Sequence, residues 1–201
     1  IRAAPPRPGR SSVKPLHLEV CGFGPFRLQQ TIDFSELDSL FVISGETGSG
    51  KTTLFDAISY ALYEQPLGKR SKKSIRCDLC GADDSTWVRF RFQAGGATWE
   101  VYRAPHLVRP KLRGSGNKVD QVTTLHRIDG DTRTALASKA SDITKTIVEE
   151  VLHLTHEQFS KILVLPQGEF QKFLEEESKQ RSELLRKLFP VSLHQNLVER
   201  V

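Results

Sequence analysis

The chain has 201 residues, of which 38% are hydrophobic and 26% charged, enough apolar material for a packed core and too much for a disordered chain. No run approaches 18 apolar residues, and the first 13 residues are basic and Pro-rich with no apolar segment behind them, so we expect neither a membrane-spanning nor an exported protein. Three cysteines, an odd and small number, suit reduced thiols in a cytoplasm.

The net charge of +5 is distributed unevenly. Residues 66–118 hold 12 Lys and Arg against four Asp and Glu, whereas residues 149–183 hold eight acids against four bases. A field of one sign can attract a polyanion, but a charged run is more often a solvated loop. The charge alone therefore leaves nucleic-acid binding open.

Three strands are predicted before the first helix. Residues 17–20 and 31–34 flank a turn at residues 22–25, and the apolar run 40–43 is typical of a more buried strand. Residues 54–63 have a helical pattern.

Between this third strand and the helix, residues 45–52 read GETGSGKT, a full match to GxxxxGK[ST]. Glycines allow backbone N–H groups to surround phosphate oxygens at a helix N-terminus. Lys51 would add a point charge to those oxygens, and Thr52 a hydroxyl ligand for Mg²⁺. The strand–loop–helix context predicts binding of a nucleoside triphosphate with Mg²⁺.

A lone CxxC follows, formed by Cys77 and Cys80. Zinc would need two more ligands, and the sequence has no second CxxC or HxxxH pair, so we expect ordinary thiols.

An antiparallel β insertion in an α/β domain is predicted next. Residues 87–92 alternate strictly between apolar and polar, and the Gly95–Gly96 turn leads into a second strand at 98–103. A third strand, 121–128, lies beyond a loop at 105–118.

The C-terminal part is predicted to contain helices and one strand. Residues 141–152 have helical spacing, and residues 155–158 fit a capping box that opens a short helix. The continuous apolar run 162–165 favours a buried strand. A charged helical region then continues to the end.

The strings GFGPF, TIDF, FVISGETGSGKTTLFDAISYALY and ILVLPQGEFQKFL, in this order and spacing, resemble the N-terminal half of the SbcC-type ATPases, relatives of the SMC chromosome proteins. In that family a long coiled coil splits an ABC-class nucleotide-binding head. The resemblance implies a tail or tag remnant at 1–13, the N-terminal lobe of the head at 14–190, and the start of a coiled-coil helix at 191–201.

The resemblance also implies roles for single residues. Lys51 and Gln167 are the expected catalytic residues, and Thr52 and Gln167 the expected Mg²⁺ ligands. Arg181 matches a family arginine without an assigned role. Arg27 matches a basic position near the nucleotide, although an ordinary surface arginine is an equal alternative. The expected ATP-binding residues are Arg27, Gly45, Thr47, Gly48, Ser49, Gly50, Lys51, Thr52 and Thr53.

A complete head of this class also needs a Walker B strand ending in Asp-Glu and an LSGG-like signature, and the sequence has neither. The fold class expected is therefore a P-loop ABC-type lobe that is incomplete without its C-terminal lobe. We expect ATP hydrolysis only after completion by that lobe and by head dimerisation, and negligible hydrolysis by the isolated chain.

The resemblance implies DNA-end and hairpin processing, in which the head dimerises on ATP and gates an SbcD-type nuclease in the bacterial cytoplasm, at the nucleoid. Double-stranded DNA would be held by basic residues. The candidates are Lys69, Arg70, Lys72, Lys73, Arg76, Arg109, Lys111 and Arg113. Two alternatives remain: a small-metabolite kinase, opposed by the β insertion and the LPQGEF string, and a clamp lobe that binds ATP without chemistry.

Overall fold

The computed structural model describes residues 13–163 except 38–40, 42, 47, 68–74, 82, 106 and 110–116. By internal contacts the chain divides into two units, Ile1–Leu154 and Thr155–Val201. None of the helices in the described part combines the length and apolarity that crossing a membrane requires.

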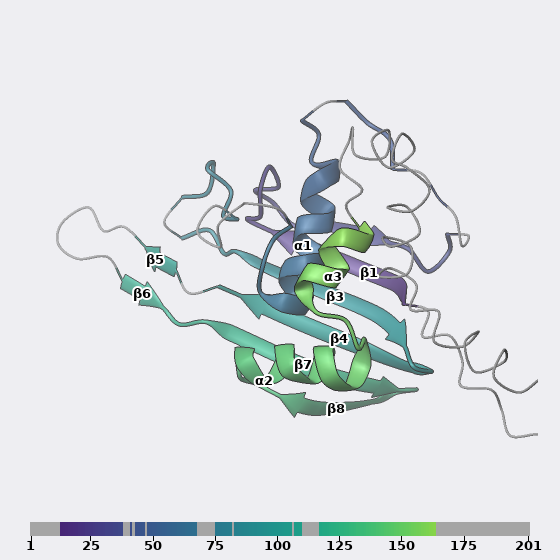
Figure 1. The fold of residues 1–201 in the computed structure, drawn as a ribbon. Coiled ribbons are helices and arrows are strands. Elements are labelled where there is room, and N and C mark those ends of the chain that lie inside the picture. The colour runs from purple at the N-terminus through teal and green to yellow at the C-terminus, as the bar shows by residue number, and fades with distance from the viewer. Residues whose placement is uncertain are drawn as a thin grey trace, which may run out of the picture. The chain divides into compact units, whose positions relative to one another are not determined.

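The first unit contains a six-stranded antiparallel sheet in the order β2-β1-β3-β4-β7-β8 (Figure 1). The predicted β insertion is confirmed, but it is continuous with the N-terminal strands because β1 pairs with both β2 and β3. The strands are β1 (Lys14–Cys21), β2 (Gln30–Asp33), β3 (Trp87–Ala94), β4 (Ala97–Ala104), β7 (Val122–Asp129) and β8 (Thr132–Ala137).

One face of this sheet is covered by helices α1 (Lys51–Tyr63) and α2 (Ala140–Thr146), and α2 continues as the π-helical turn η2 (Ile147–Val151). Side chains alternate between the two faces of a strand, so every second residue points towards the helices. Four of these residues pair in register across the sheet and are at most 2% exposed: Leu18, Phe90, Val101 and Leu125. This row is the centre of the core.

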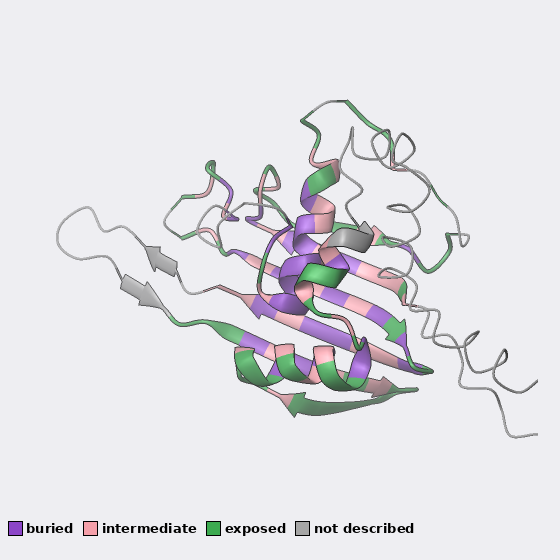
Figure 2. Cartoon of the chain, viewed as in Figure 1, coloured by how far each residue is buried: buried purple, intermediate pink, exposed green. Residues whose placement is uncertain are grey.

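Two parts of the β region differ from the prediction. The loop expected at 105–118 contains a short antiparallel pair, β5 (Leu107–Arg109) and β6 (Asn117–Val119). Strand β8 was not predicted, because as an edge strand it is exposed along nearly its whole length (Figure 2) and carries no inward apolar alternation.

The strand predicted at 40–43 is not present at the two positions that the structure describes. Phe41 and Ile43 lie outside regular secondary structure, and Phe41 is 38% exposed. A buried strand is stabilised by pairing with neighbours, and no strand among the described residues pairs with this segment. Leu40 and Val42 lie outside the described residues.

The second unit contains helix α3 (His156–Leu163). The predicted capping box is confirmed: the Thr155 N–H donates to Gln158 Oε1 (2.9 Å), and the Gln158 N–H donates to Thr155 Oγ1 (3.3 Å). The strand predicted at 162–165 is wrong for Ile162 and Leu163, because the cap directs the chain into a helix that includes them. An apolar run alone does not distinguish the two structures. Gln167, Arg181 and residues 191–201 lie outside the described residues.

Candidate functional site

The phosphate-loop motif lies at the start of α1, which confirms its predicted context on the helix side. Gly50 is the N-cap, with φ at 94°, and Gly48 also has positive φ, at 88°. The first helical hydrogen bond runs from the Leu54 N–H to the Gly50 carbonyl (3.2 Å). The N–H groups of residues 51–53 therefore precede the helical ladder, and the first turn carries no acidic residue. Such a helix start favours an anion.

Lys51 folds back over the loop that precedes it. Its Nζ donates to the carbonyl oxygens of Gly45 (2.6 Å) and Glu46 (2.7 Å), and Ser49 Oγ lies 3.5 Å away. The Ser49 N–H in turn donates to the Glu46 carbonyl (3.2 Å). An ammonium group has three N–H donors, and these three contacts engage them and place the positive charge inside the loop.

The GFGPF turn (residues 22–26) packs directly against this loop. A Cβ added to Gly50 would lie 2.6 Å from Phe26 Cζ and 2.9 Å from Pro25 Cγ. A Cβ on Gly24 would lie 2.4 Å from Thr53 Cγ2, and Thr53 is buried. These glycines are required because the two segments touch where a side chain would stand. The sequence predicted the turn but not its contact with the phosphate loop.

On its other side the turn is bonded to the CxxC segment. The Gly24 N–H donates to the Ile75 carbonyl (2.8 Å), and the Cys77 N–H donates to the Gly22 carbonyl (2.9 Å). Arg27, directly after the turn, pairs through Nε with Asp84 Oδ2 at 3.0 Å. The hydrogen bond from the Gly81 N–H is the main cause that holds the pKa of Asp84 below its ordinary value, and the hydrogen bond from Arg27 is the second. The turn therefore lies between the phosphate loop and residues 75–84.

The other end of α1 is held by a buried arginine that sequence reasoning missed. Arg103 of β4 is 0% exposed, and its Nε donates to the Ala61 carbonyl (2.6 Å). Its Nη2 donates to the Leu62 carbonyl (3.3 Å) and to Thr144 Oγ1 of α2 (3.1 Å). Burial lowers the pKa of Arg103 to about 10, and the Glu64 carboxylate, 3.6 Å away, opposes that shift.

Arg103 therefore remains charged at neutral pH and caps the C-terminus of α1, where a cation is favourable. The one signal in the sequence was its position: it lies two residues after Val101 and so on the inward face of β4, a place where an arginine needs a partner.

Further side-chain bonds fix the chain around the end of α1. Tyr63 Oη donates to the Leu154 carbonyl (3.0 Å), and Ser59 Oγ donates to the Gln65 carbonyl (2.8 Å). Asp56 Oδ1 accepts from the Leu67 N–H (2.9 Å). The helix that presents the phosphate loop is thus bonded near its C-terminus to the segments that follow it.

The face of the sheet opposite the helices carries charged networks. Glu100 is 2% exposed and pairs with Arg91 (2.8 Å) and with Arg133. Arg89 lies over the rings of Trp87 and Tyr102, at 5.6 Å and 5.5 Å from their centroids. A hollow of about 620 Å³ opens beside these aromatic rings. None of the predicted site residues that the structure describes is among the side chains of these networks.

Many of the predicted DNA contacts cannot be placed. Lys69, Arg70, Lys72, Lys73, Lys111 and Arg113 lie outside the described residues, as do Thr47 and Gln167 of the nucleotide site. Arg109 lies in β5. Arg76 donates to Thr86 Oγ1 (3.0 Å) and to the Gly81 carbonyl (2.5 Å), so its guanidinium has a structural role.

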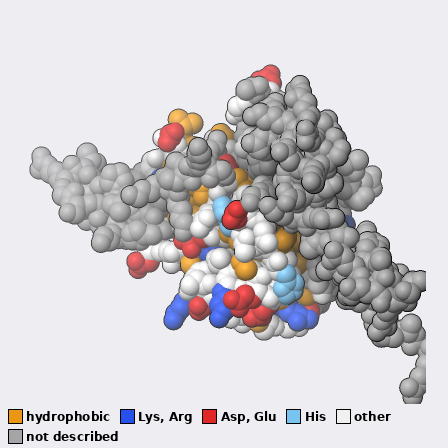
Figure 3. Space-filling view, viewed as in Figure 1, with side chains coloured by type: hydrophobic (Ala, Val, Ile, Leu, Met, Phe, Trp, Pro, Cys, Tyr) orange, Lys and Arg blue, Asp and Glu red, His pale blue; other side chains and the backbone are white. Residues whose placement is uncertain are grey.

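Acidic and basic side chains alternate on the part of the surface that Figure 3 shows below the grey region, over α2 and β8. Two ion pairs lie there, Arg127 with Asp129 (3.0 Å) and Lys145 with Glu149 (3.9 Å). This described surface therefore does not present a field of one sign.

The chain matches a known family and several named proteins over most of its length. A family model described as an AAA domain matches residues 17–194. The SbcC component of the SbcCD nuclease of Vibrio cholerae is 36% identical over 189 residues, which cover 92% of this chain and 19% of that relative. The proteins of the same name in Lactococcus lactis and Treponema pallidum are also 36% identical, over 88% and 94% of this chain and 17% and 18% of theirs. The resemblance to SbcC-type proteins is confirmed, and the chain spans less than a fifth of the length of these relatives.

Proposed function

Because the chain belongs to the AAA domain family, we propose that it binds ATP and Mg²⁺ at residues 45–53 and forms the ATP-binding half of a DNA-processing ATPase head. The observation that carries this proposal is the position of Lys51, whose ammonium group lies inside a glycine-rich loop at the start of α1. The charge of Lys51, the backbone N–H donors of residues 51–53 and the N-terminus of α1 all favour a phosphate group at this place.

The residues present fit such a ligand. Gly48, with positive φ, has nothing within 4 Å of an added Cβ, so the loop is open at that point. Thr52 is exposed at the helix start, where its hydroxyl is available to Mg²⁺. A bound Mg²⁺ would neutralise charge that develops on the γ-phosphate, and Lys51 would hold the phosphate oxygens in position. Gln167 remains our candidate for orienting the attacking water.

The ATPase site is composite in this proposal. Residues 14–190 form the N-terminal lobe of an ABC-type head, and residues 191–201 begin the coiled-coil helix. The C-terminal lobe supplies the Walker B strand, and a second head supplies the signature. The length of the relatives supports this proposal, as does the apolar segment around Phe41, which has no strand partner among the described residues.

We further propose that ATP-driven head dimerisation gates a nuclease of the SbcD type that acts on double-stranded DNA ends and hairpins. The support is the name of the relatives, which are parts of a nuclease. Bacterial cytoplasm, at the nucleoid, is the matching location. The small-metabolite kinase is not favoured, because the relatives that the chain matches are parts of a nuclease.

Binding of MgATP tests the nucleotide site. Lys51→Ala removes the charge from the loop and is expected to weaken MgATP binding by about tenfold to a hundredfold, the effect of losing one charged hydrogen-bond donor. Lys145→Ala is the matched control, because Lys145 is exposed and pairs with Glu149 in the same helical region. Equal affinities for the two variants would contradict the proposal.

Phosphate release tests the composite site. We expect negligible release from the chain alone, and release that depends on Lys51 once the segment with Walker B and signature motifs is added. Rapid turnover by the chain alone, lost in Lys51→Ala, would show that the chain carries a complete site.

Charge reversal tests the DNA contacts. Reversing Lys69, Arg70, Lys72 and Lys73 together should weaken duplex binding and reduce its salt dependence by about one unit of slope for each lost phosphate contact. Arg76 is left intact, because its bonds to Thr86 and Gly81 make it structural. An unchanged affinity and salt slope would identify these lysines and arginine as a solvated cluster.

A further inference from the structure

The two cysteines of the CxxC motif lie in one hydrogen-bonded turn. The Cys80 N–H donates to the Cys77 carbonyl at 3.1 Å. The Cα atoms that bound such a four-residue turn are less than about 7 Å apart. Disulfides span Cα distances of about 4.4–6.8 Å, so the backbone already suits a bridge between these two residues.

The two thiols differ in access. Cys77 is 2% exposed, whereas Cys80 is partly exposed and is the one that a reagent from solvent meets first. Burial is the main cause that raises the pKa of Cys80, and the electrostatic effect of Cys77 is the second. The positive charge of Arg76 opposes this shift. At neutral pH Cys80 is therefore a thiol, and its exchange with a disulfide accelerates as pH rises.

Across the described residues, no group of three or more His, Cys, Asp and Glu side chains is arranged to hold a metal ion. The third cysteine, Cys21, has its Sγ near the Arg27 carbonyl (3.8 Å) and Ser85 Oγ (3.9 Å).

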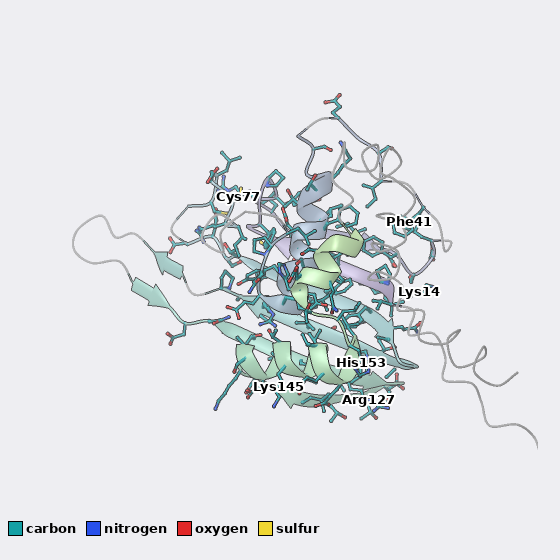
Figure 4. All side chains as sticks on the ribbon, viewed as in Figure 1. Lys14, Phe41, Cys77, Arg127, Lys145 and His153 are labelled. Atoms are coloured by element: carbon teal, nitrogen blue, oxygen red, sulfur yellow. The ribbon has the colours of Figure 1, made fainter. Side chains whose placement is uncertain are left out.

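The pair is bonded to the turn that supports the phosphate loop. Cys77 donates its N–H to the Gly22 carbonyl, and Cys80 Sγ lies 3.2 Å from the position that a Cβ of Gly22 would take. Figure 4 shows Cys77 in this part of the first unit. At the other end of the same turn, Phe26 touches Gly50, the N-cap of α1. A change in the position of Cys80 can therefore reach the phosphate loop through two contacts, that of Cys80 with Gly22 and that of Phe26 with Gly50.

We propose that Cys77 and Cys80 form a reversible thiol–disulfide modification site, oxidised by small-molecule disulfides, and that its closure alters the GFGPF turn against the phosphate loop. The Cys80 thiolate attacks one sulfur of the oxidant and releases one thiol. The Cys77 thiolate then attacks Cys80 Sγ and releases the second thiol. Two protein thiols and one disulfide become one protein disulfide and two small thiols, so atoms and electrons balance.

The effect on nucleotide rests on the proposed ATP site. A disulfide draws Cys80 Sγ towards Cys77 Sγ and so changes the packing of Cys80 Sγ against Gly22. We expect this to loosen the contact of Pro25 and Phe26 with Gly50 and to weaken MgATP binding at least about fivefold, the lower end of ordinary coupling between sites.

The experiment treats the full-length protein with glutathione disulfide and then blocks free thiols. In unfolded, alkylated and trypsin-digested samples, residues 77–89 form one peptide that contains Cys77 and Cys80 but not Cys21. We expect this peptide to carry no blocking group and to weigh two hydrogens less than the free dithiol peptide, and reduction before blocking to yield the peptide with two blocking groups. Cys21→Ser should behave as wild type, whereas Cys77→Ser should stop at the mixed disulfide on Cys80.

MgATP affinity is measured on the same reduced and oxidised samples. The proposal predicts weaker binding in the oxidised wild type and no change on oxidant treatment of the Cys77→Ser, Cys80→Ser double variant. Absence of the bridge, or a bridge to Cys21, overturns the site. A bridge that forms without changing MgATP affinity overturns its coupling to the loop. Failure of the reduced protein to bind MgATP contradicts the proposed function instead and leaves the peptide mass as an independent test of the bridge.

Discussion

The two ends of α1 are held in different ways. At its start, Gly50 and Lys51 are supported by a close glycine contact with the GFGPF turn and by bonds within one short loop. At its end, the guanidinium of Arg103 and the hydroxyl of Tyr63 join the helix to β4, α2 and Leu154. The start carries the proposed chemistry, whereas the end fixes the direction in which the helix presents it. The two ends can therefore be disturbed separately.

The largest effect is expected at the end of the helix. Arg103→Met keeps an apolar stem of similar length but removes the guanidinium that bonds to the carbonyls of Ala61 and Leu62 and pairs with the carboxylate of Glu64. Breaking a buried ion pair from one side costs about 3–5 kcal/mol. We expect the free energy of unfolding, measured with urea, to fall by about that amount.

Arg127→Met is the control for this change. Arg127 pairs with Asp129, and both side chains are about half exposed, so its loss should cost less than about 1 kcal/mol. If both variants lose the same stability, the end of α1 is not held by Arg103 as described.

The contact at the start of the helix is tested by Gly50→Ala. The added methyl would lie 2.6 Å from Phe26, and alanine also resists the positive φ at this position. Overpacking and backbone strain together should destabilise the protein by about 2–3 kcal/mol. Gly48→Ala separates the two causes, because Gly48 shares the positive φ but has nothing within 4 Å of an added Cβ. Gly48→Ala should lower the stability by only about 1 kcal/mol. If both variants lose the same stability, backbone strain alone, without the contact to Phe26, explains why residue 50 is a glycine.

Tyr63→Phe should have a smaller effect. It removes the hydroxyl that donates to the Leu154 carbonyl at 3.0 Å and keeps the buried ring. The expected loss is about 1 kcal/mol in a urea unfolding experiment, the usual net value of one such hydrogen bond. A loss no greater than that of Arg127→Met would show that this bond does not help to hold the end of α1.

The same contrast explains what the sequence could predict. Lys51 and its glycines were found because phosphate binding needs particular residues in consecutive order, and the alternation of β3 was found because the period of a strand is local. Arg103 was missed because its partners lie about 40 residues away on each side, in α1 and α2, and no local pattern records such a contact. The strand predicted at residues 40–43 was wrong at Phe41 and Ile43 for a related reason, since apolar residues alone do not supply a partner strand.

The smallest expected effect concerns the support of the GFGPF turn. The Gly81 N–H and Arg27 lower the pKa of Asp84 below 3.8, its ordinary value. A carboxyl whose pKa is lowered on folding stabilises the folded state above the unfolded pKa, and this contribution is lost as pH falls through the folded pKa. The contribution should therefore be constant at neutral pH and disappear below about pH 4. In an NMR titration, the Gly81 amide signal should move in that acidic range and stay still in Asp84→Asn. Asp129→Asn, which breaks an exposed Arg–Asp pair elsewhere, should leave the Gly81 titration unchanged. A Gly81 signal that titrates equally with and without the Asp84 carboxylate would show that this ion pair does not support the GFGPF turn.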